Sequence, residues 1–318
     1  MCYEQWRYGE EIASQELPKS PVFIIGHWRS GTTHLQNILS HDPQFASITL
    51  NQAAMPLDFL TFGKWISAAL EKSIPNKRLM DNVAVSSTAP WEEEIALVAT
   101  TTLSFYHVSF FPDAVDEIFD EAILFRGRNE QLIEQWKARY MWFLKKHALV
   151  SDSNTLLLKN PANTARIDLL LELFPDARFI HIHRNPYEVF RSTVHLYYEA
   201  QKEWGLHTPE RQKIIEHVLQ SYPKLMRAYQ QEHTKIPAGR LAEVRFEDLE
   251  CNPLETIEAA YRDSGITNYA EAKPHFESYL SSIQGYQKNA HELPNLEVQL
   301  VGDQWAEWFT YLGYNLTK

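Results

Sequence analysis

The stretch Gly26-His27-Trp28-Arg29-Ser30-Gly31-Thr32-Thr33 follows the apolar run Val22–Ile25 and precedes a helical pattern. The order of strand, glycine-bounded loop and helix is typical of loops whose main-chain N–H groups bind phosphate oxygens at a helix N-terminus. The spacing Gly-x-x-x-x-Gly is kept, but Thr32 stands where a nucleotide-hydrolysing loop carries lysine. The stretch therefore predicts a site for a nucleotide-like phosphate, without ordinary ATP chemistry.

Short apolar runs elsewhere in the chain predict the rest of a sheet. The predicted strands are Val22–Ile25, residues 155–158, Arg178–His183 and the weaker Leu241–Arg245. These runs are apolar rather than alternating, which is typical of buried parallel strands with helices on both faces. We expect an α/β fold of the P-loop-like, three-layer kind, with a central, mostly parallel sheet.

Helical patterns separate and follow these strands. They cover residues 92–103, 129–149, 162–174, 187–203, 253–262 and 296–312. Nothing in the composition marks a linker, so we expect a single domain over residues 1–318. Residues of about 51–150 are expected to form a helical insertion packed on the sheet.

Composition limits the classes of function. The chain has 318 residues, of which 44% are apolar, and its net charge of −11 disfavours a general nucleic-acid binder. Cys2 and Cys251 form neither a disulfide framework nor a metal signature. The first residues lack the apolar core of a signal peptide, and no run approaches the roughly 20 apolar residues of a membrane helix. We therefore expect a soluble cytoplasmic protein without a transmembrane segment, whose oligomeric state stays open.

The first loop carries several groups able to bind phosphate. The main-chain N–H groups of Ser30, Gly31, Thr32 and Thr33 can face an anion at the positive end of the helix dipole. Three of these residues add hydroxyl donors. Arg29 places a cation inside the loop, where a guanidinium can grip an oxyanion through two N–H groups. A plain turn with an exposed arginine is the alternative.

A second motif follows the strand Arg178–His183. Arg184 and Asn185 leave the strand, Pro186 begins a helix, and Ser192 lies about two helical turns along. Ligands of open α/β sheets bind at the carboxyl ends of the strands. Arg184 and Ser192 are therefore candidates for holding a second phosphate, against the alternative of a solvated arginine and an ordinary helix serine.

Together the two motifs resemble the sulfotransferases that use 3′-phosphoadenosine 5′-phosphosulfate. In that family, a loop like the one from Arg29 to Thr33 binds the 5′-phosphosulfate. A strand ending in Arg-Asp-Pro, with a serine eight residues after the arginine, binds the 3′-phosphate; Arg184 and Ser192 match at that spacing. Asn185 replaces the aspartate. The resemblance implies this nucleotide as the sulfate donor and adenosine 3′,5′-bisphosphate as the product.

Weaker likenesses extend this resemblance over roughly residues 20–315. Lys159-Asn160-Pro161-Ala162-Asn163 looks like the family's Lys-Ser-Pro-x-His element, and Arg245-Phe246-Glu247-Asp248-Leu249 looks like its Tyr-Glu-Asp-Leu element. Asp81-Asn82-Val83 and Pro90-Trp91-Glu92-Glu93-Glu94 look like a bacterial branch of the family. Tyr286 and Lys288 lie where relatives have a loop that closes over the nucleotide, so they are further candidates for binding it.

Sulfuryl transfer depends on positioning and on electrostatic stabilisation, as phosphoryl transfer does. The acceptor must align behind sulfur, a base must take its proton, and cations must stabilise the charge on the sulfuryl oxygens and the leaving phosphate. Arg29 and Lys159 are the candidate cations. The resemblance implies that no metal is required, and no cluster of ligand residues in the sequence calls for one.

The identity of the general base stays open. The resemblance favours a glutamate of the Glu92-Glu93-Glu94 run, and Glu92 has the matching spacing. Glu93 is the next candidate, although first-turn acids on a solvated helix are an equally ordinary explanation for the run. His27 in the phosphate loop is the rival, because histidine titrates near neutrality, and His195 is a third candidate.

The sequence leaves two other classes of function open. One is a nucleotide kinase or related phosphate-loop enzyme, which the missing lysine disfavours. The other is a catalytically inactive nucleotide-binding module. For a sulfotransferase, we expect a hydroxyl or amine acceptor that is small or lipid-like. Candidate side chains for its pocket are Phe59, Phe62, Trp65, Tyr197, Tyr198 and Trp204.

Overall fold

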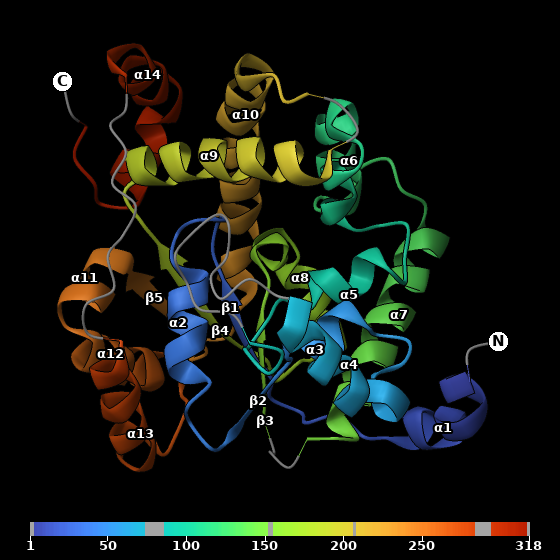
Figure 1. Cartoon of the computed structure of the whole chain (residues 1–318). Coiled ribbons are helices and arrows are strands. Elements are labelled where there is room, and N and C mark those ends of the chain that lie inside the picture. Colours follow the sequence, from blue (N-terminus) through green and yellow to red (C-terminus); the bar gives the residue numbers. More distant parts are fainter. Residues whose placement is uncertain (1–2, 74–85, 152–154, 206–207, 284–293, 317–318) are drawn as a thin grey trace.

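A five-stranded parallel sheet lies at the centre of the molecule (Figure 1). The computed structural model describes residues 3–73, 86–151, 155–205, 208–283 and 294–316. The strands are β1 (Val22–Ile25), β2 (Phe45–Ser47), β3 (Thr155–Lys159), β4 (Arg178–His183) and β5 (Leu241–Arg245). Their order across the sheet is β2-β3-β1-β4-β5. The predicted α/β class is confirmed. The edge strand β2 lies outside the predicted set because its three residues form no apolar run.

Both faces of the sheet are buried, which explains the apolar runs. Val22 lies opposite Leu157 on β3 and Arg178 on β4. Along β1, Val22 and Ile24 contribute to one apolar core, while Phe23 and Ile25 contribute to the other. Successive side chains of a strand point to opposite faces, so both sets must be apolar here.

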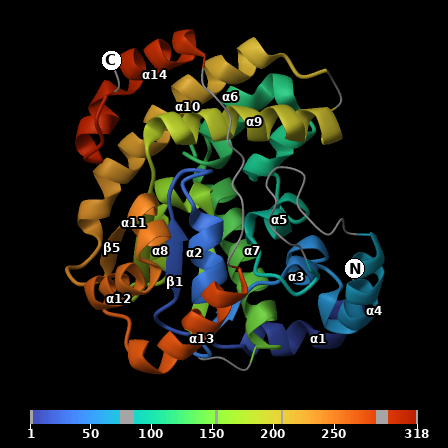
Figure 2. The ribbon, with the colours of Figure 1, turned by 60° about the vertical axis from the view of Figure 1, so that its left-hand side comes forward.

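Four helices cover the face to which Val22 and Ile24 point (Figure 2). They are α2 (Thr32–Leu39), α11 (Phe246–Cys251), α12 (Pro253–Ser264) and α13 (Tyr269–Ser282). Leu35 and Ile38 of α2 are fully buried there, together with Phe276 of α13. This layer fixes the axis of α2, and hence the direction in which its N-terminus points.

A second set of helices covers the opposite face, and α9 runs across above the strands (Figure 1). These helices are α7 (Glu130–Ala148), α8 (Ile167–Leu173), α9 (Pro186–Trp204), α10 (Arg211–Glu232) and α14 (Asn295–Tyr311). The remaining helices are α1 (Tyr3–Ser14), α3 (Leu50–Ala54), α4 (Phe59–Ser73), α5 (Glu94–Val98) and α6 (Val115–Ala122). The 3₁₀ turns are η1 (Phe105–Ser109), η2 (Pro112–Ala114), η3 (Pro161–Ala165) and η4 (His233–Lys235). Among the described residues, no helix combines the length and apolarity needed to cross a membrane.

The helix predicted over residues 92–103 is much shorter in the structure. Helix α5 covers only Glu94–Val98. The carboxylate of Glu94 accepts hydrogen bonds from the Ser104 hydroxyl at 2.8 Å and from the Phe105 main-chain N–H at 3.0 Å. These bonds draw the following segment back towards the start of α5, so the chain turns instead of continuing as a helix.

The helix predicted over residues 162–174 is divided into η3 and α8. The Asn160 side chain accepts a hydrogen bond from the Ala162 N–H at 3.0 Å and starts η3. Arg166, whose φ of −131° and ψ of 22° lie outside the helical region, then separates the two elements. At this break, the Arg166 side chain enters a buried polar network in which it bonds to Glu94.

Candidate active site

The two predicted phosphate motifs meet at the point in the sheet where the order of successive strands reverses. Strands β1 and β4 are neighbours, but the chain leaves β1 towards β2 at one edge and leaves β4 towards β5 at the other. Ligands of open α/β sheets bind outside the carboxyl ends of strands at such a switch point. The loop after β1 and the segment after β4 both lie there.

Close packing explains why the first loop is bounded by glycines. A Cβ added at Gly26 would lie 2.2 Å from the Ile182 carbonyl oxygen, and one at Gly31 would lie 2.2 Å from the Phe246 ring. Their φ angles, 142° and 106°, also favour glycine. Between them, Arg29 has a φ of 68°, a left-handed conformation that non-glycine residues adopt at a cost and that clusters at functional sites.

The N-terminus of α2 is arranged to receive an anion. Gly31 is its N-cap and provides no side chain to bond the first N–H groups of the helix. Thr32 and Thr33 are the first helical residues, and both line a cavity together with Arg29. Helix N-termini with accessible N–H groups favour negative charge.

A side-chain hydrogen bond joins the two motifs directly. The Nε–H of Arg29 donates to the Ser192 hydroxyl at 2.8 Å, although 163 residues separate them. Arg184 lies nearby and is partly buried, with its Nη2 3.3 Å from the Glu188 carboxylate. Burial lowers the pKa of Arg184, and the neighbouring Arg29 and Arg191 cations act in the same direction. The site is thus rich in guanidinium groups.

The departure at Asn185 is explained by its position. Its side-chain oxygen accepts a hydrogen bond from the Tyr187 N–H at 3.0 Å and caps α9, with Pro186 in the first turn. Asparagine and aspartate are both favoured caps, so either residue starts the helix in the same way. The replacement therefore keeps a cap at the start of α9.

A cavity of about 340 Å³ adjoins the phosphate loop. It lies between the loop after β1, α5, η1 and α9, and most of its lining is apolar. The large apolar side chains of the lining are Trp28, Trp91, Ile95, Phe105, Val108, Phe110, Leu196 and Tyr197. Its polar groups include Arg29, Glu92 and Lys159, so the charged groups of the site border an apolar chamber.

Glu92 and Lys159 form an ion pair at this border. The Lys159 Nζ also lies 3.4 Å from the Thr33 hydroxyl of the phosphate loop. The second carboxylate oxygen of Glu92 accepts a hydrogen bond from the Tyr106 hydroxyl. The Glu92 side chain is 12% exposed, against 2% for Lys159. The carboxylate therefore faces the cavity, and the lysine links it to the phosphate loop.

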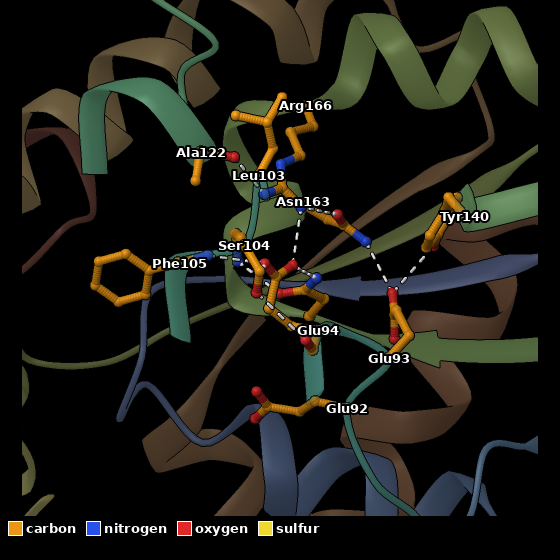
Figure 3. A network of polar contacts seen from close by, with 12 residues as sticks. Glu92, Glu93, Glu94, Leu103, Ser104, Phe105, Ala122, Tyr140, Asn163 and Arg166 are labelled. Carbon is orange, nitrogen blue, oxygen red and sulfur yellow. Dashed lines mark hydrogen bonds and ion pairs between the residues drawn. The ribbon is translucent and has the colours of Figure 1, made fainter. Parts of the chain in front are cut away.

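Three consecutive glutamates point to three different surroundings (Figure 3). Glu93 is fully buried and accepts hydrogen bonds from the Tyr140 hydroxyl at 3.1 Å and the Asn163 amide at 2.9 Å. Its other carboxylate oxygen accepts a hydrogen bond from the main-chain N–H of Lys159 at 3.2 Å. Burial raises the pKa of Glu93 to about 7. Its carboxyl therefore bonds to the main chain of β3, and Glu93 is not among the described residues that line the cavity.

Glu94 is also fully buried and pairs with Arg166, whose Nη1 lies 3.0 Å from the carboxylate. The Asn160 amide donates to the same carboxylate at 2.7 Å. Burial opposes the ionisation of Glu94, but Arg166 and these hydrogen bonds hold its pKa below the ordinary value. Glu93 and Glu94 are therefore not the solvated first-turn acids considered from the sequence; they anchor the segment that carries Glu92.

The remaining candidates occupy other positions. His27 is buried and neutral, since burial lowers its pKa to about 4, and its Nδ1 lies 2.8 Å from the Trp28 carbonyl oxygen. Neither His27 nor His195 of α9 is among the described residues that line the cavity. Tyr286, Lys288 and the Asp81-Asn82-Val83 element lie outside the described residues.

Of the predicted acceptor aromatics whose side chains the structure describes, only one lines the cavity. Tyr197 does so from α9. Phe59 is buried in the core against Lys146, while Phe62 and Trp65 are exposed on α4, and Tyr198 is exposed on α9. The side chain of Trp204 lies outside the described part of the chain. A one-dimensional pattern does not distinguish aromatic side chains of a core from those of a pocket.

The structure adds residues that the sequence did not single out for the site. Tyr106 binds Glu92 within the cavity, and no motif marks it. Asn160 and Asn163, which stand where the family element has serine and histidine, are the partners of Glu94 and Glu93. The sequence did contain a signal for these contacts, because the side-chain amides of both residues can donate a hydrogen bond to a buried carboxylate.

Comparison with known proteins decides the class. Residues 21–271 match the sequence profile described as the sulfotransferase family. The chain belongs to the sulfotransferase family. It is an enzyme of the transferase class, as the two phosphate motifs predicted, and the nucleotide kinase and inactive-module alternatives are not supported. Its matching segment includes both motifs and the Glu92 region.

Relatives of this sulfotransferase are bacterial. It is 29% identical over 317 residues to the omega-hydroxy-beta-dihydromenaquinone-9 sulfotransferase Stf3 of Mycobacterium bovis, covering 99% of this chain and 81% of that protein. The protein of the same name from Mycobacterium tuberculosis matches equally well. Its fold is similar to the crystal structure of sulfotransferase STF9 from Mycobacterium avium, with a TM-score of 0.76, 18% identity and coverage of 99% and 81%. The crystal structure of sulfotransferase STF1 from Mycobacterium tuberculosis is also similar, with a TM-score of 0.68 and 18% identity. The match covers 96% of this chain and 80% of STF1.

Proposed function

We propose that this sulfotransferase transfers the sulfuryl group of 3′-phosphoadenosine 5′-phosphosulfate to a hydroxyl group on an apolar acceptor. The observation that carries the donor assignment is the Arg29–Ser192 hydrogen bond, which brings the 5′ and 3′ phosphate motifs into one site. The N-terminus of α2 with Arg29 is assigned to the 5′-phosphosulfate. Arg184 and Ser192 are assigned to the 3′-phosphate. We keep Tyr286 and Lys288 as candidate nucleotide contacts.

Glu92 is proposed as the general base. Its carboxylate takes the proton of the acceptor hydroxyl as that oxygen forms a bond to sulfur, and the bond from sulfur to the bridging phosphate oxygen breaks. The products are a sulfate ester and adenosine 3′,5′-bisphosphate. Arg29 and Lys159 stabilise the charge that develops on the sulfuryl oxygens and the leaving phosphate. Lys159 suits this role because it contacts both Glu92 and Thr33.

The donor is tested by calorimetric titration with adenosine 3′,5′-bisphosphate in the presence of a chelator, and with ATP and Mg²⁺. We expect the bisphosphate to bind more tightly, without need of metal. In the Arg184→Ala variant, loss of a charged hydrogen-bond donor to the 3′-phosphate should weaken bisphosphate binding by about 10- to 100-fold. Binding of adenosine 5′-phosphate should change much less.

A matched control separates this effect from general loss of charge. Arg240 immediately precedes β5, at the end of the sheet away from the phosphate motifs, and pairs with Asp176 at 3.0 Å. Arg240→Ala should leave the affinity for both nucleotides unchanged. Equal weakening of both nucleotides by Arg184→Ala would remove the assigned role, and preference for ATP with Mg²⁺ would remove the proposed donor.

The acceptor is proposed to be a hydroxyl at the end of an apolar chain. Two observations support this class: the cavity beside Glu92 is lined mainly by apolar side chains, and the relative Stf3 is named for a hydroxylated menaquinone derivative. Burial of each methylene contributes about 0.8 kcal/mol, or roughly fourfold in kcat/KM. For primary alcohols of increasing chain length, kcat/KM should rise by about that factor per methylene until the cavity is filled.

A polar substitution in the cavity provides the control for acceptor length. Leu196 lines the cavity from α9, whereas Tyr198 is exposed on the same helix. Leu196→Asn should reduce kcat/KM for long alcohols more than for short ones, and Tyr198→Asn should not. A kcat/KM that does not depend on chain length would contradict an apolar acceptor.

A further inference from the structure

The segment from Arg245 to Leu249 packs against both phosphate motifs, although the proposed reaction gives it no role. Arg245 is the last residue of β5, and Phe246 is the first residue of α11. Phe246 is buried, with 7% of its surface exposed, and belongs to the core on the α2 side of the sheet. Its position beside β4 places it next to the switch point.

The Phe246 ring contacts one residue of each motif. The guanidinium carbon of Arg184 lies 4.5 Å from the ring centroid. Gly31, the N-cap of α2, packs so closely that any Cβ there would overlap the ring edge. His34, in the first turn of α2, meets the same ring edge-on at a centroid distance of 6.3 Å. One side chain therefore supports the 5′ loop and the 3′ cation together.

The next residue holds the main chain of the second motif. The Glu247 carboxylate accepts the Asn185 N–H at 3.1 Å and the Tyr314 hydroxyl at 2.7 Å. Asn185 immediately follows Arg184, so this bond fixes the point from which the arginine side chain starts. Phe246 then fixes where that side chain ends.

An aromatic face suits a phosphate-binding arginine for a physical reason. Cation–π contact holds a guanidinium in place without neutralising its charge, and it leaves the N–H groups at the edge of the plane able to donate. The Glu188 carboxylate already accepts a hydrogen bond from Nη2 of Arg184 at 3.3 Å, and the ring, unlike a second carboxylate, does not compete with a phosphate for the other N–H groups. Phenylalanine stands here where the family element has tyrosine, so the ring, rather than a hydroxyl, accounts for the contact.

We propose that Phe246 is a positioning residue for the 3′-phosphate: its ring holds Arg184 in register with the Gly31 end of the 5′ loop. The inference rests on the proposed donor. It predicts that the ring contributes to recognition of the 3′-phosphate specifically, although Phe246 itself touches no phosphate. Replacement of the ring should therefore act through Arg184.

The test compares Phe246→Leu, which keeps an apolar side chain but loses the ring, with Phe246→Tyr, which keeps the ring. Phe246→Leu should weaken binding of adenosine 3′,5′-bisphosphate by roughly 5- to 20-fold, the range of a partly buried cation–π contact. Binding of adenosine 5′-phosphate, which lacks the phosphate assigned to Arg184, should weaken less, because packing of the ring on Gly31 affects both nucleotides alike. Phe246→Tyr should bind both nucleotides as the wild type does.

A double-mutant cycle shows whether the ring acts through Arg184. In the Arg184→Ala background, Phe246→Leu should cause no further loss of bisphosphate affinity, because the contact has already been removed. In steady-state kinetics, Phe246→Leu should raise the KM for the donor and leave kcat at saturation largely unchanged. Phe276→Leu, a buried ring of the same core on α13, is the matched control and should leave nucleotide selectivity unchanged.

The outcomes separate this inference from the proposed function. If the wild type shows no preference for the bisphosphate over adenosine 5′-phosphate, the donor assignment fails and the inference fails with it. If the wild type shows that preference and Phe246→Leu retains it in full, only the role of Phe246 is overturned. Equal weakening of both nucleotides, or additive losses in the cycle, would likewise reduce Phe246 to a core residue.

Discussion

Replacing Glu92 by glutamine is expected to lower kcat by about 10²- to 10³-fold, the contribution of a positioned general base. Glutamine keeps the size of the side chain, and its carbonyl oxygen can still accept the hydrogen bond from Lys159, while its NH2 group faces the Tyr106 hydroxyl, which can accept instead of donate. It cannot take a proton from the acceptor. The affinity for adenosine 3′,5′-bisphosphate should therefore stay within about twofold of the wild type, because this substitution removes a group used in the chemical step.

Two comparisons make this prediction specific. Glu199 on α9 pairs with Lys202 and is not among the described residues that line the cavity, so Glu199→Gln should leave kcat unchanged. Glu92→Ala opens space beside Lys159, and added formate should restore part of its activity by supplying a small base. Unchanged kcat in Glu92→Gln would instead direct attention to Glu93, whose pKa is raised to about 7 by burial.

Replacing Arg166 by leucine is expected to cost about 3 to 5 kcal/mol of the free energy of unfolding, the effect of leaving a buried charge without its partner. Arg166 is almost wholly buried, bonds to Glu94 at 3.0 Å and stacks over Trp136 at 4.8 Å from the ring centroid. Without it, the fully buried Glu94 carboxylate loses its only described ion-pair partner. Urea unfolding at neutral pH measures the loss.

The pH dependence of this loss identifies its cause. In the wild type, the lowered pKa of Glu94 means that its stabilising contribution is present above the unfolded-state value of 4.5 and declines as pH falls through the lower folded-state value. In Arg166→Leu, protonation of Glu94 relieves the buried charge. Burial without a partner raises the pKa of Glu94 in the variant, so the difference in stability between the two proteins should be largest at neutral pH and should shrink as pH falls through that raised pKa towards the lowered pKa of the wild type.

Two further variants serve as controls for the buried pair. The double variant Arg166→Leu, Glu94→Gln removes both charges and should be more stable than Arg166→Leu alone. Arg262→Leu, at an exposed arginine beside Asp263, should change stability by less than about 0.5 kcal/mol. A loss in Arg166→Leu that is the same at every pH would indicate lost packing against Trp136 rather than an unpaired charge.

Much of the sheet could be predicted because its strands are buried on both faces. Strands β1, β4 and β5 have the predicted bounds, and β3 is one residue longer than predicted. Strand β2 and the 22-residue helix α10 lie outside the predicted set. Helix α5 is shorter than predicted because Glu94 binds the residues that follow it, a contact across 11 positions that local periodicity does not contain.

The sequence by itself determined the class of the protein and the two phosphate motifs. A phosphate loop depends on glycines, donors and an arginine at fixed spacing within one short segment, and these can be read directly. Asn185 was open to misinterpretation as a loss, but a cap is a local device that asparagine performs as well as aspartate.

Only the tertiary structure decided how Glu92, Glu93 and Glu94 differ. Their partners Lys159, Asn163 and Arg166 come from a segment more than 60 positions away, brought beside them by the sheet and by the break between η3 and α8. Burial and hydrogen bonding depend on those distant groups, so three identical residues in a row become a cavity carboxylate and two buried anchors. The contact of Phe246 with both motifs likewise joins residues far apart in the chain, so it can be seen only in the folded protein.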